Sequence, residues 1–354
     1  MKDNMCHSRV LNCPQGVAKM GTLDYHNRPT RLLSVLMLTL SLFLFGANGA
    51  FAHSTGKMHM IELWAEKIMP GDEGGNALFA YRMAEHIVKK GPRQKDVTSR
   101  YASEPTIPGP TIVIDEGDEV MLTLRHVFDP GDSTRLEQVS VHVHGVHYDI
   151  LSDGTLEYIN LVADESATPV MNYTYHWVAA PGTAGTWAYH DHNMITLNGA
   201  EDKGLYGALI VNDHTRIKTV SHDTKTMRSA FSSVAKEYVL FIGDDAFWGQ
   251  EINNRTGKQT PLWDNPELEA RKNSNVRFHL IALGTNTHKF KLPGYRWVDP
   301  GTKQIIKKKT IGPLEKHVFA IRAKYSSVYK DVNFANQSLG MKGQFKVKKS
   351  RRRW

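Results

Sequence analysis

From Met60 onward, apolar residues come in short and often alternating runs, which Gly, Pro, Asp and Asn separate. Alternation with a period of two is typical of half-buried β-strands, and closely spaced turn residues favour a β-sandwich over a helical protein. The pattern predicts strands over residues 111–114, 120–125, 139–144, 186–190, 205–211, 237–242, 276–283 and 343–347. A helix is predicted only over 77–89, where Leu78, Met83 and Ile87 fall near one helical face.

The strand-rich sequence divides into two halves at a polar segment. Residues 214–235 are rich in Ser, Thr, Lys and His and lack apolar periodicity, which indicates an interdomain connection. The halves, 58–213 and 236–349, each have the length of one Greek-key sandwich. The predicted fold class is therefore all-β with two tandem sandwiches, followed by a basic tail at 350–354.

A different apolar pattern stands near the start of the chain. Residues 32–52 form a continuous apolar run that follows two arginines and ends in a small-x-small pattern. A retained anchor is the alternative, since a spanning helix needs ~20 apolar residues, but the small residues favour a secretory signal cleaved after Ala52. We therefore expect 1–52 to be a leader and the mature chain to be exported, periplasmic or extracellular, without a stable membrane span.

Cysteine usage limits the chemistry of the predicted mature chain. Both cysteines, Cys6 and Cys13, precede the apolar run, so export would leave no disulfide and no thiolate metal ligand. The full chain has a formal net charge of +8, and much of the excess lies at its C-terminal end. A basic terminus is more often solvated than bound to a partner, so we predict no nucleic-acid binding.

Four histidines in the first half stand in two pairs with equal spacing. His142 and His144 lie in the alternating run VSVHVHG, and His190 and His192 end the aromatic-rich run TWAYHDH. Residues i and i+2 of a strand point to one face, so each pair projects its imidazoles together, and neighbouring strands ~5 Å apart would gather all four. Neutral imidazole binds copper, zinc, iron and nickel, so the spacing predicts a metal site without naming the metal.

Three motifs surround these histidine pairs. PTIPGPTIVIDEGDEVMLTL, HVHGVHYDILSDGT and GTWAYHDHNM with GLYGALIV occur in this order over most of 105–211. They resemble the opening strands and the two histidine loops of a cupredoxin domain in the multicopper oxidase and copper nitrite reductase family. The resemblance implies copper as cofactor, with His142 as a type 2 ligand and His144, His190 and His192 as type 3 ligands.

The second half resembles the same family in outline, although few of its ligand positions are retained. In NTHKFKLPG, His288 stands at the first histidine of the family loop H-P-F-H-L-H-G. Near the end, Asp331 and Asn336 stand at the cysteine and last histidine of H-C-H-x-x-x-H, and Met341 stands at the axial position. Type 1 copper needs a thiolate, and Asp191 occupies the cysteine position of the first domain. The resemblance therefore implies a protein without type 1 copper.

Three functions fit this residue set. The first is a copper oxidoreductase with one or two coppers on the first-domain histidines, reduced directly by a small-molecule or protein donor. We rank it first because Asp191 and Asp149 stand beside the ligands and can handle protons. The second is a non-enzymatic copper-binding or structural subunit. The third is a nitrite-reductase-like enzyme that uses His144, His190 and a histidine of a neighbour; two-domain relatives are commonly trimers, so we expect a homo-oligomer such as a trimer.

The predicted cleavage site suggests one further metal candidate. Cleavage after Ala52 would make His53 the N-terminus, where its amine and imidazole could chelate copper with His59 as a third nitrogen. The alternative is a disordered terminus with incidental histidines.

Overall fold

The computed structural model describes residues 56–69, 78–127, 138–155, 171–192, 203–213 and 234–349. The predicted leader, His53, the basic tail and nearly all of the predicted connection lie outside these ranges. Within them, no helix has the length and apolar character needed to cross a bilayer.

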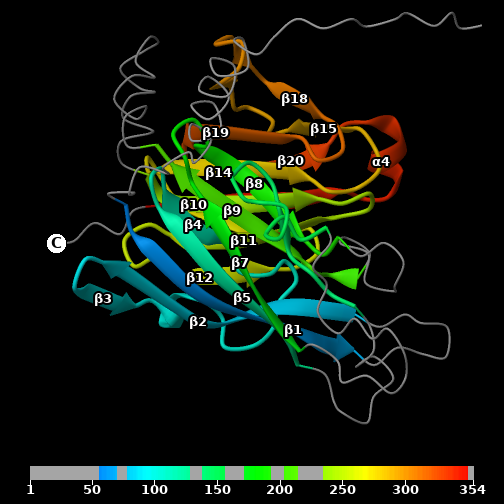
Figure 1. Ribbon diagram of the computed structural model, residues 1–354. Coiled ribbons are helices and arrows are strands. Elements are labelled where there is room, and N and C mark those ends of the chain that lie inside the picture. The colour runs from blue at the N-terminus through cyan, green and yellow to red at the C-terminus, as the bar shows by residue number, and fades with distance from the viewer. Residues whose placement is uncertain are drawn as a thin grey trace, which may run out of the picture. The chain divides into compact units, whose positions relative to one another are not determined.

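The first half forms two sheets (Figure 1). One has the strand order β3-β2-β1-β5-β7 and the other has the order β4-β9-β8-β6. The strands are β1 (Met58–Met69), β2 (Leu78–Lys90), β3 (Arg93–Asp96), β4 (Ile112–Asp115), β5 (Glu119–Val127), β6 (His142–Val143), β7 (Asn172–Val178), β8 (Gly185–His190) and β9 (Tyr206–Asn212), with the 3-10 turn η1 (Thr98–Arg100) after β3. Alternate residues of β5, including Val120, Leu122 and Leu124, are fully buried between the sheets. This burial of one face is what the period-two pattern predicts.

The second half repeats this topology. One sheet has the order β12-β11-β10-β14-β19 and the other has β13-β21-β20-β15-β18, with the pair β16-β17 beside them. The bounds are β10 (Val234–Ile242), β11 (Phe247–Asn253), β12 (Gln259–Leu262), β13 (Leu268–Arg271), β14 (Asn275–Ala282), β15 (His288–Lys291), β16 (Trp297–Val298), β17 (Ile305–Ile306), β18 (Lys308–Ile311), β19 (Lys316–Arg322), β20 (Ser327–Asp331), α4 (Phe334–Ser338) and β21 (Lys342–Lys348). In each half the first strand pairs in parallel with a later strand, β1 with β5 and β10 with β14. By the same correspondence, β15 and β20 are the equivalents of β6 and β8.

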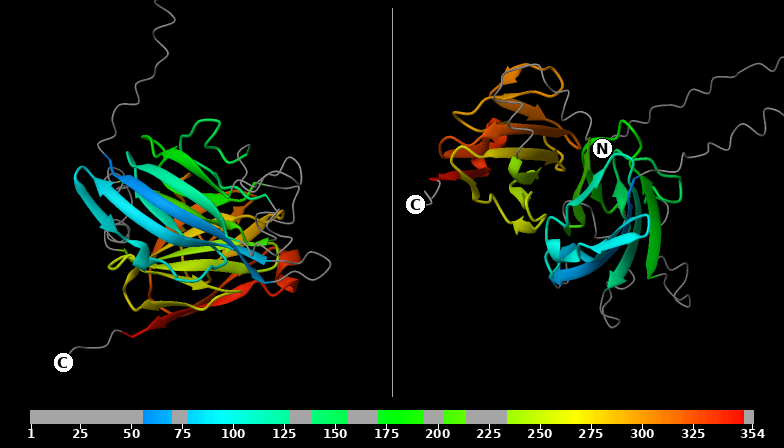
Figure 2. Two further views of the ribbon diagram at one scale, coloured as in Figure 1. Left: turned by 60° about the horizontal axis from the view of Figure 1, so that its bottom comes forward. Right: turned by 90° about the vertical axis from the view of Figure 1, so that its left-hand side faces the viewer.

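The two sandwiches contact each other through their inner sheets. Strands β8 and β9 pack on β10 and β14, where the Tyr206 and Phe241 rings lie 4.9 Å apart in an edge-on contact. The Thr186 Oγ1 also bonds His279 Nδ1 across this interface at 2.6 Å. Figure 2 shows the sandwiches from two further directions, the first in blue to green and the second in yellow to red.

The all-β fold class is confirmed, with one error in the predicted elements. Residues 78–90 form strand β2 and not the predicted helix. Phe79, Tyr81 and Met83 are buried on alternate positions, and a bulge near Ala84 then shifts the alternation so that His86 also points inward. Leu78 and Met83, five residues apart with no bulge between them on β2, lie on opposite faces of the strand, although their spacing resembles a helical face.

Candidate metal centre

Strands β6 and β8 bring the two histidine pairs together. They pair antiparallel with His142 directly opposite His190, and the His144 N–H donates to the Ala188 carbonyl at 3.0 Å. The neighbouring arrangement of the two histidine strands, on which the predicted convergence depends, is therefore confirmed.

The four imidazoles form one patch, the histidine face, made of His142, His144, His190 and His192. The His142 ring centroid lies 4.8 Å from that of His144, 5.5 Å from that of His190 and 5.1 Å from that of His192. The His144 and His190 rings stack with centroids 5.2 Å apart. All four side chains are half-buried, so a ligand can reach them from solvent.

Three imidazoles of the histidine face, those of His142, His144 and His190, favour the neutral form near pH 7. Burial, followed by the neighbouring imidazoles, lowers the pKa of His144 to about 4. Burial also lowers the pKa of His190 to about 4, and it lowers the pKa of His142. Only a neutral imidazole has a lone pair for a metal, so these histidines are already in the ligand form.

Hydrogen bonds fix which ring nitrogens are free. His142 Nδ1 donates to the Asp153 carbonyl, and His190 Nδ1 donates to the Asp191 carbonyl at 2.8 Å. Carbonyls only accept, so the Nε2 atoms of both rings carry lone pairs. His144 Nε2 then donates to His190 Nε2 at 3.0 Å. This outer-shell anchoring through Nδ1 is the usual arrangement of metal-binding histidines.

The donor set fits copper, although its atoms do not yet surround one point. Among the described residues, no group of three or more His, Cys, Asp and Glu side chains is arranged as a formed metal site. A metal held by both Nε2 atoms would require the His144 proton to move from Nε2 to Nδ1, which leaves the ring neutral.

Three further residues, Gly145, Trp187 and Lys316, lie next to the histidine face. Gly145 has a φ of +76°, and a Cβ there would lie 1.9 Å from the Trp187 ring, so only glycine fits. Lys316 of β19 places its ammonium over the same Trp187 ring. Burial lowers the pKa of Lys316 to about 8. No signal in the sequence pointed to Lys316, because it comes from the second sandwich.

The two aspartates predicted to handle protons lie apart from the imidazole rings. Asp191 is buried, shares the inward parity of Tyr189, and accepts from the Ser140 N–H at 2.9 Å. Asp149 is exposed on the loop after β6 and accepts from the Leu151 N–H at 3.1 Å. Both carboxylates thus accept from backbone N–H groups, and their proton-handling roles stay predictions.

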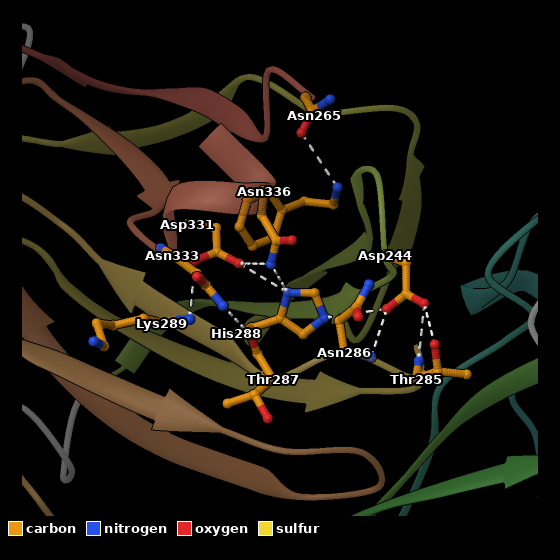
Figure 3. A network of polar contacts seen from close by, with 11 residues as sticks. Asp244, Asn265, Thr285, Asn286, Thr287, His288, Lys289, Asp331, Asn333 and Asn336 are labelled. Carbon is orange, nitrogen blue, oxygen red and sulfur yellow. Dashed lines mark hydrogen bonds and ion pairs between the residues drawn. The ribbon is translucent and has the colours of Figure 1, made fainter. Parts of the chain in front are cut away.

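His288 lies in a different environment, shown in Figure 3. Its Nδ1 bonds the Asp331 carboxylate at 2.8 Å, and Asn336 Nδ2 bonds the same carboxylate oxygen at 2.6 Å. All three side chains are buried, and so is Met341. Burial alone would raise the pKa of Asp331, but hydrogen bonds from His288, the Asn333 N–H and Asn336 outweigh it and lower the pKa to about 2. We call His288, Asp331 and Asn336 the His288 cluster. Within it, the Nδ1 atom of His288 and the carboxylate of Asp331 bind each other.

Comparison with known proteins agrees with this architecture. A family model described as a multicopper oxidase matches residues 89–216. A probable nitrite reductase-hydroxylamine oxidoreductase fusion protein of Kuenenia stuttgartiensis is 28% identical over 228 residues, which are 60% of this chain and 24% of that protein. The multicopper oxidase MCE of Talaromyces pinophilus is 31% identical over 143 residues, 39% of this chain and 21% of that protein. The chain thus spans about a quarter or less of these relatives.

Solved structures share the fold. A copper nitrite reductase from Nitrosomonas europaea superposes with a TM-score of 0.53 at 15% identity, covering 82% of this chain and 94% of that one. A multicopper oxidase crystal structure gives a TM-score of 0.50 at 21% identity, with 82% and 89% covered. Multicopper oxidases and copper nitrite reductases bind copper, and all four residues of the histidine face lie within the matched segment. Residues 89–216 of this chain are thus similar to a multicopper oxidase domain.

Proposed function

We propose that the protein is an exported copper-dependent oxidoreductase in which His142, His144, His190 and His192 bind one or two copper ions. The observation that carries the proposal is the convergence of four imidazoles on one accessible face inside the family-matched segment. Copper held there would supply one-electron redox chemistry at imidazole ligands.

The chain's own residues prepare the histidine face for this role. The carbonyls of Asp153 and Asp191 hold two rings with their Nε2 lone pairs available, which lowers the cost of ordering ligands. Gly145 lets Trp187 pack directly against the loop that follows the first histidine pair. As His144 becomes a ligand through Nε2, its proton would move to Nδ1; because the ring is already neutral, this change of tautomer releases no net proton near pH 7.

We further propose that electrons reach the histidine face directly from the donor. From residue 54 onward the sequence has no cysteine, and the His288 cluster fills the position that the family uses for type 1 copper. Tyr148, Ile150 and Leu151 are exposed beside the face, and the Tyr148 ring lies 6.2 Å from that of His142. This apolar rim suits contact with a small reductant or with a donor protein.

A nitrite-reductase-like activity is the second candidate. Of the imidazole nitrogens on the face, His144 Nε2 and His190 Nε2 are in hydrogen-bonding contact, and a type 2 copper would use these two with a histidine from another subunit. That reading requires a homo-oligomer, such as a trimer. The Kuenenia relative, named as a probable nitrite reductase fusion, motivates testing it.

The test is oxygen consumption by copper-loaded protein with ascorbate, a cuprous salt or a bulky phenol as donor, and nitrite reduction in a parallel assay. We expect ascorbate or cuprous ion to support oxygen uptake, slow or absent oxidation of the phenol, and loss of activity in His142→Ala/His190→Ala. His176→Ala is the matched control, because this histidine of β7 lies outside the face and pairs with Glu119 of β5.

The outcomes distinguish the candidates. Nitrite reduction without oxygen uptake would favour the second activity. No turnover with any donor, in protein shown to hold copper, would leave a copper-binding or structural subunit. Rapid phenol oxidation would contradict the proposal, because the chain would then need an electron relay of the thiolate type.

A further inference from the structure

A second concave site lies away from the histidine face. A cavity of about 640 Å³ opens between β1, β2, β3, β4 and η1, and none of the four face histidines lines it. Its wall carries five cationic side chains, namely Lys57, Lys90, Arg93, Lys95 and Arg100. A second cavity of about 320 Å³ shares Lys95 and Arg100 with the first and adds Arg255 from the loop after β11. We call the two together the basic cavity.

Most of this positive charge is not neutralised by the protein. Lys57 is the exception, because its ammonium pairs with Asp115 and lies 3.7 Å from Asp118. In the segments that the structure covers, no carboxylate lies within ion-pair distance of Lys90, Arg93, Lys95, Arg100 or Arg255. A cavity lined by charges of one sign focuses its field and concentrates counter-ions.

Arg100 lines both parts of the basic cavity. A Cβ on Gly257 of the second sandwich would lie 2.8 Å from Arg100 Nε, so the guanidinium is packed against a backbone that only glycine can provide at a φ of +74°. Arg100 is half-buried and lies near His86, whose pKa falls to about 3 through burial, the His59 ring and the Arg100 charge in that order. This cation therefore lies against the second sandwich, where both parts of the cavity meet.

The inner wall of the cavity is rigid and engaged in its own hydrogen bonds. His59 Nε2 bonds Asp118 at 3.0 Å, His59 Nδ1 bonds His86 Nε2 at 2.9 Å, and His86 Nδ1 bonds the Tyr101 hydroxyl at 2.7 Å. Both nitrogens of each imidazole are therefore used within the wall. This arrangement does not favour His59 as the third copper nitrogen suggested by the sequence. The remaining lining is mixed, with Val88, Val113 and Ile114 as apolar members and Gln94, Asp115 and Asn212 as polar ones.

From these observations we infer that the basic cavity binds a small multivalent anion, an organic molecule with two or more carboxylate or phosphate groups. The volume lies within the roughly 300–1,000 Å³ of ligand sites, and arginine and lysine side chains are the groups that bind such oxyanions. An alternative role explains Arg93 and Lys95, because charged side chains on an edge strand such as β3 prevent it from pairing with a strand of another molecule. That role does not account for Arg100 or Arg255, which come from other segments and converge on the same space.

Calorimetric titration of the intact protein with citrate and with pyrophosphate tests the inference. We expect one site per chain, an affinity that falls with added salt, and at least tenfold weaker binding in Lys90→Glu/Lys95→Glu. Both lysines are exposed, so this variant should fold. Lys272→Glu/Lys342→Glu is the matched control, with the same change of charge on exposed residues of the second sandwich that line neither cavity.

Three results would overturn the inference. One is no binding of either anion. Another is equal weakening in the control pair, which would mean attraction by net charge alone. The third is binding of a long heparin chain but not of citrate or pyrophosphate, which would assign the surface to a polyanionic macromolecule. Arg100→Gln should weaken binding at unchanged thermal stability, and His142→Ala/His190→Ala should leave the titration unchanged, which separates this site from the copper proposal.

Discussion

Equivalent strands of the two sandwiches carry two very different histidine environments. On β6 and β8, four half-buried imidazoles face one another, and the side-chain carboxylates of Asp149 and Asp191 are bonded elsewhere. On β15 and next to β20, one buried imidazole is held by Asp331 and Asn336. The same framework thus offers several nitrogen lone pairs to an incoming metal in one half, whereas in the other a carboxylate binds Nδ1 of a single imidazole whose Nε2 has no hydrogen-bond partner in the part of the chain that the structure describes.

The difference shows what a metal site requires beyond histidine and position. A ligand must keep an available lone pair, and a buried group that lacks a metal must find another partner. His288 has found that partner in a carboxylate, which explains how the second sandwich keeps a polar cluster at 0% to 2% exposure. We therefore expect the two sites to respond in opposite ways to substitution, one through metal binding and the other through folding.

The largest effect on the free energy of unfolding is expected from Asp331→Ala. Removal of one partner of a buried pair typically costs about 3–5 kcal/mol, because the other group remains buried without compensation. His142→Ala, on a half-buried face, should cost under about 1 kcal/mol of unfolding free energy in metal-free protein. Denaturant unfolding of both variants measures the contrast; equal losses would show that the two environments do not differ as described.

A smaller effect is expected on copper affinity. Loss of a residue that only orients a ligand typically weakens metal binding by about 10–100-fold. His190→Ala removes a proposed ligand itself, so we expect copper affinity to fall by at least about 100-fold. Copper affinity can be measured by competition with a chelator. His288→Ala should leave the affinity and the copper content unchanged once the folded fraction is matched. Copper loss in His288→Ala alone would move the metal site to the second sandwich.

The acid dependence of stability should separate the two sites by pH window. His144 and His190 have folded pKa values of about 4 against an ordinary 6.5, so the unfolded state binds more protons, and stability falls between about pH 6.5 and 4. Asp331 has a folded pKa of about 2 against 3.8, so its contribution, about 2 kcal/mol, is present above pH 4 and lost toward pH 2. In metal-free protein, Asp331→Asn should remove only the lower window and His144→Ala should reduce only the upper one. The opposite pattern would mean that the protonation states have been misassigned.

Much of the first site could be predicted from the sequence, because its information is local. The spacing of His142 with His144, and of His190 with His192, fixes a common side-chain direction on each strand, and alternation within the run fixes the strands. The convergence then needs only one pairing, β6 with β8. The helix expected at 77–89 was wrong because both faces of this strand bury apolar residues, Met83 in the first core and Leu78 against the cluster between the sandwiches.

The second site and the basic cavity could not be predicted in the same way. The sequence shows that Asp331 and Asn336 replace metal ligands, but the bond between His288 and Asp331 joins residues 43 positions apart. Likewise, Arg100 and Gly257 come into contact across the two sandwiches. Such contacts depend on how strands and sandwiches pack, and a single sequence contains no periodic signal for that packing.

The smallest effect is expected from Lys316, the residue that links the two sandwiches at the histidine face. Its ammonium lies over Trp187, and its charge contributes to the low pKa of His144 after burial, His190 and His142. A nearby positive charge also opposes binding of a cation, but partial exposure to solvent keeps such a term to about 1 kcal/mol or less.

Lys316→Met keeps the apolar stem on the indole ring and removes only the charge. We expect copper to bind more tightly by less than about tenfold, and the pKa of His144 in metal-free protein to rise by less than in His190→Ala. Chelator competition and histidine NMR titration measure the two quantities, with the exposed Lys342→Met as the charge-matched control. Weaker copper binding in Lys316→Met would show that the lysine supports the site in another way, for example by holding the second sandwich against β8, and the electrostatic account of this residue would be wrong.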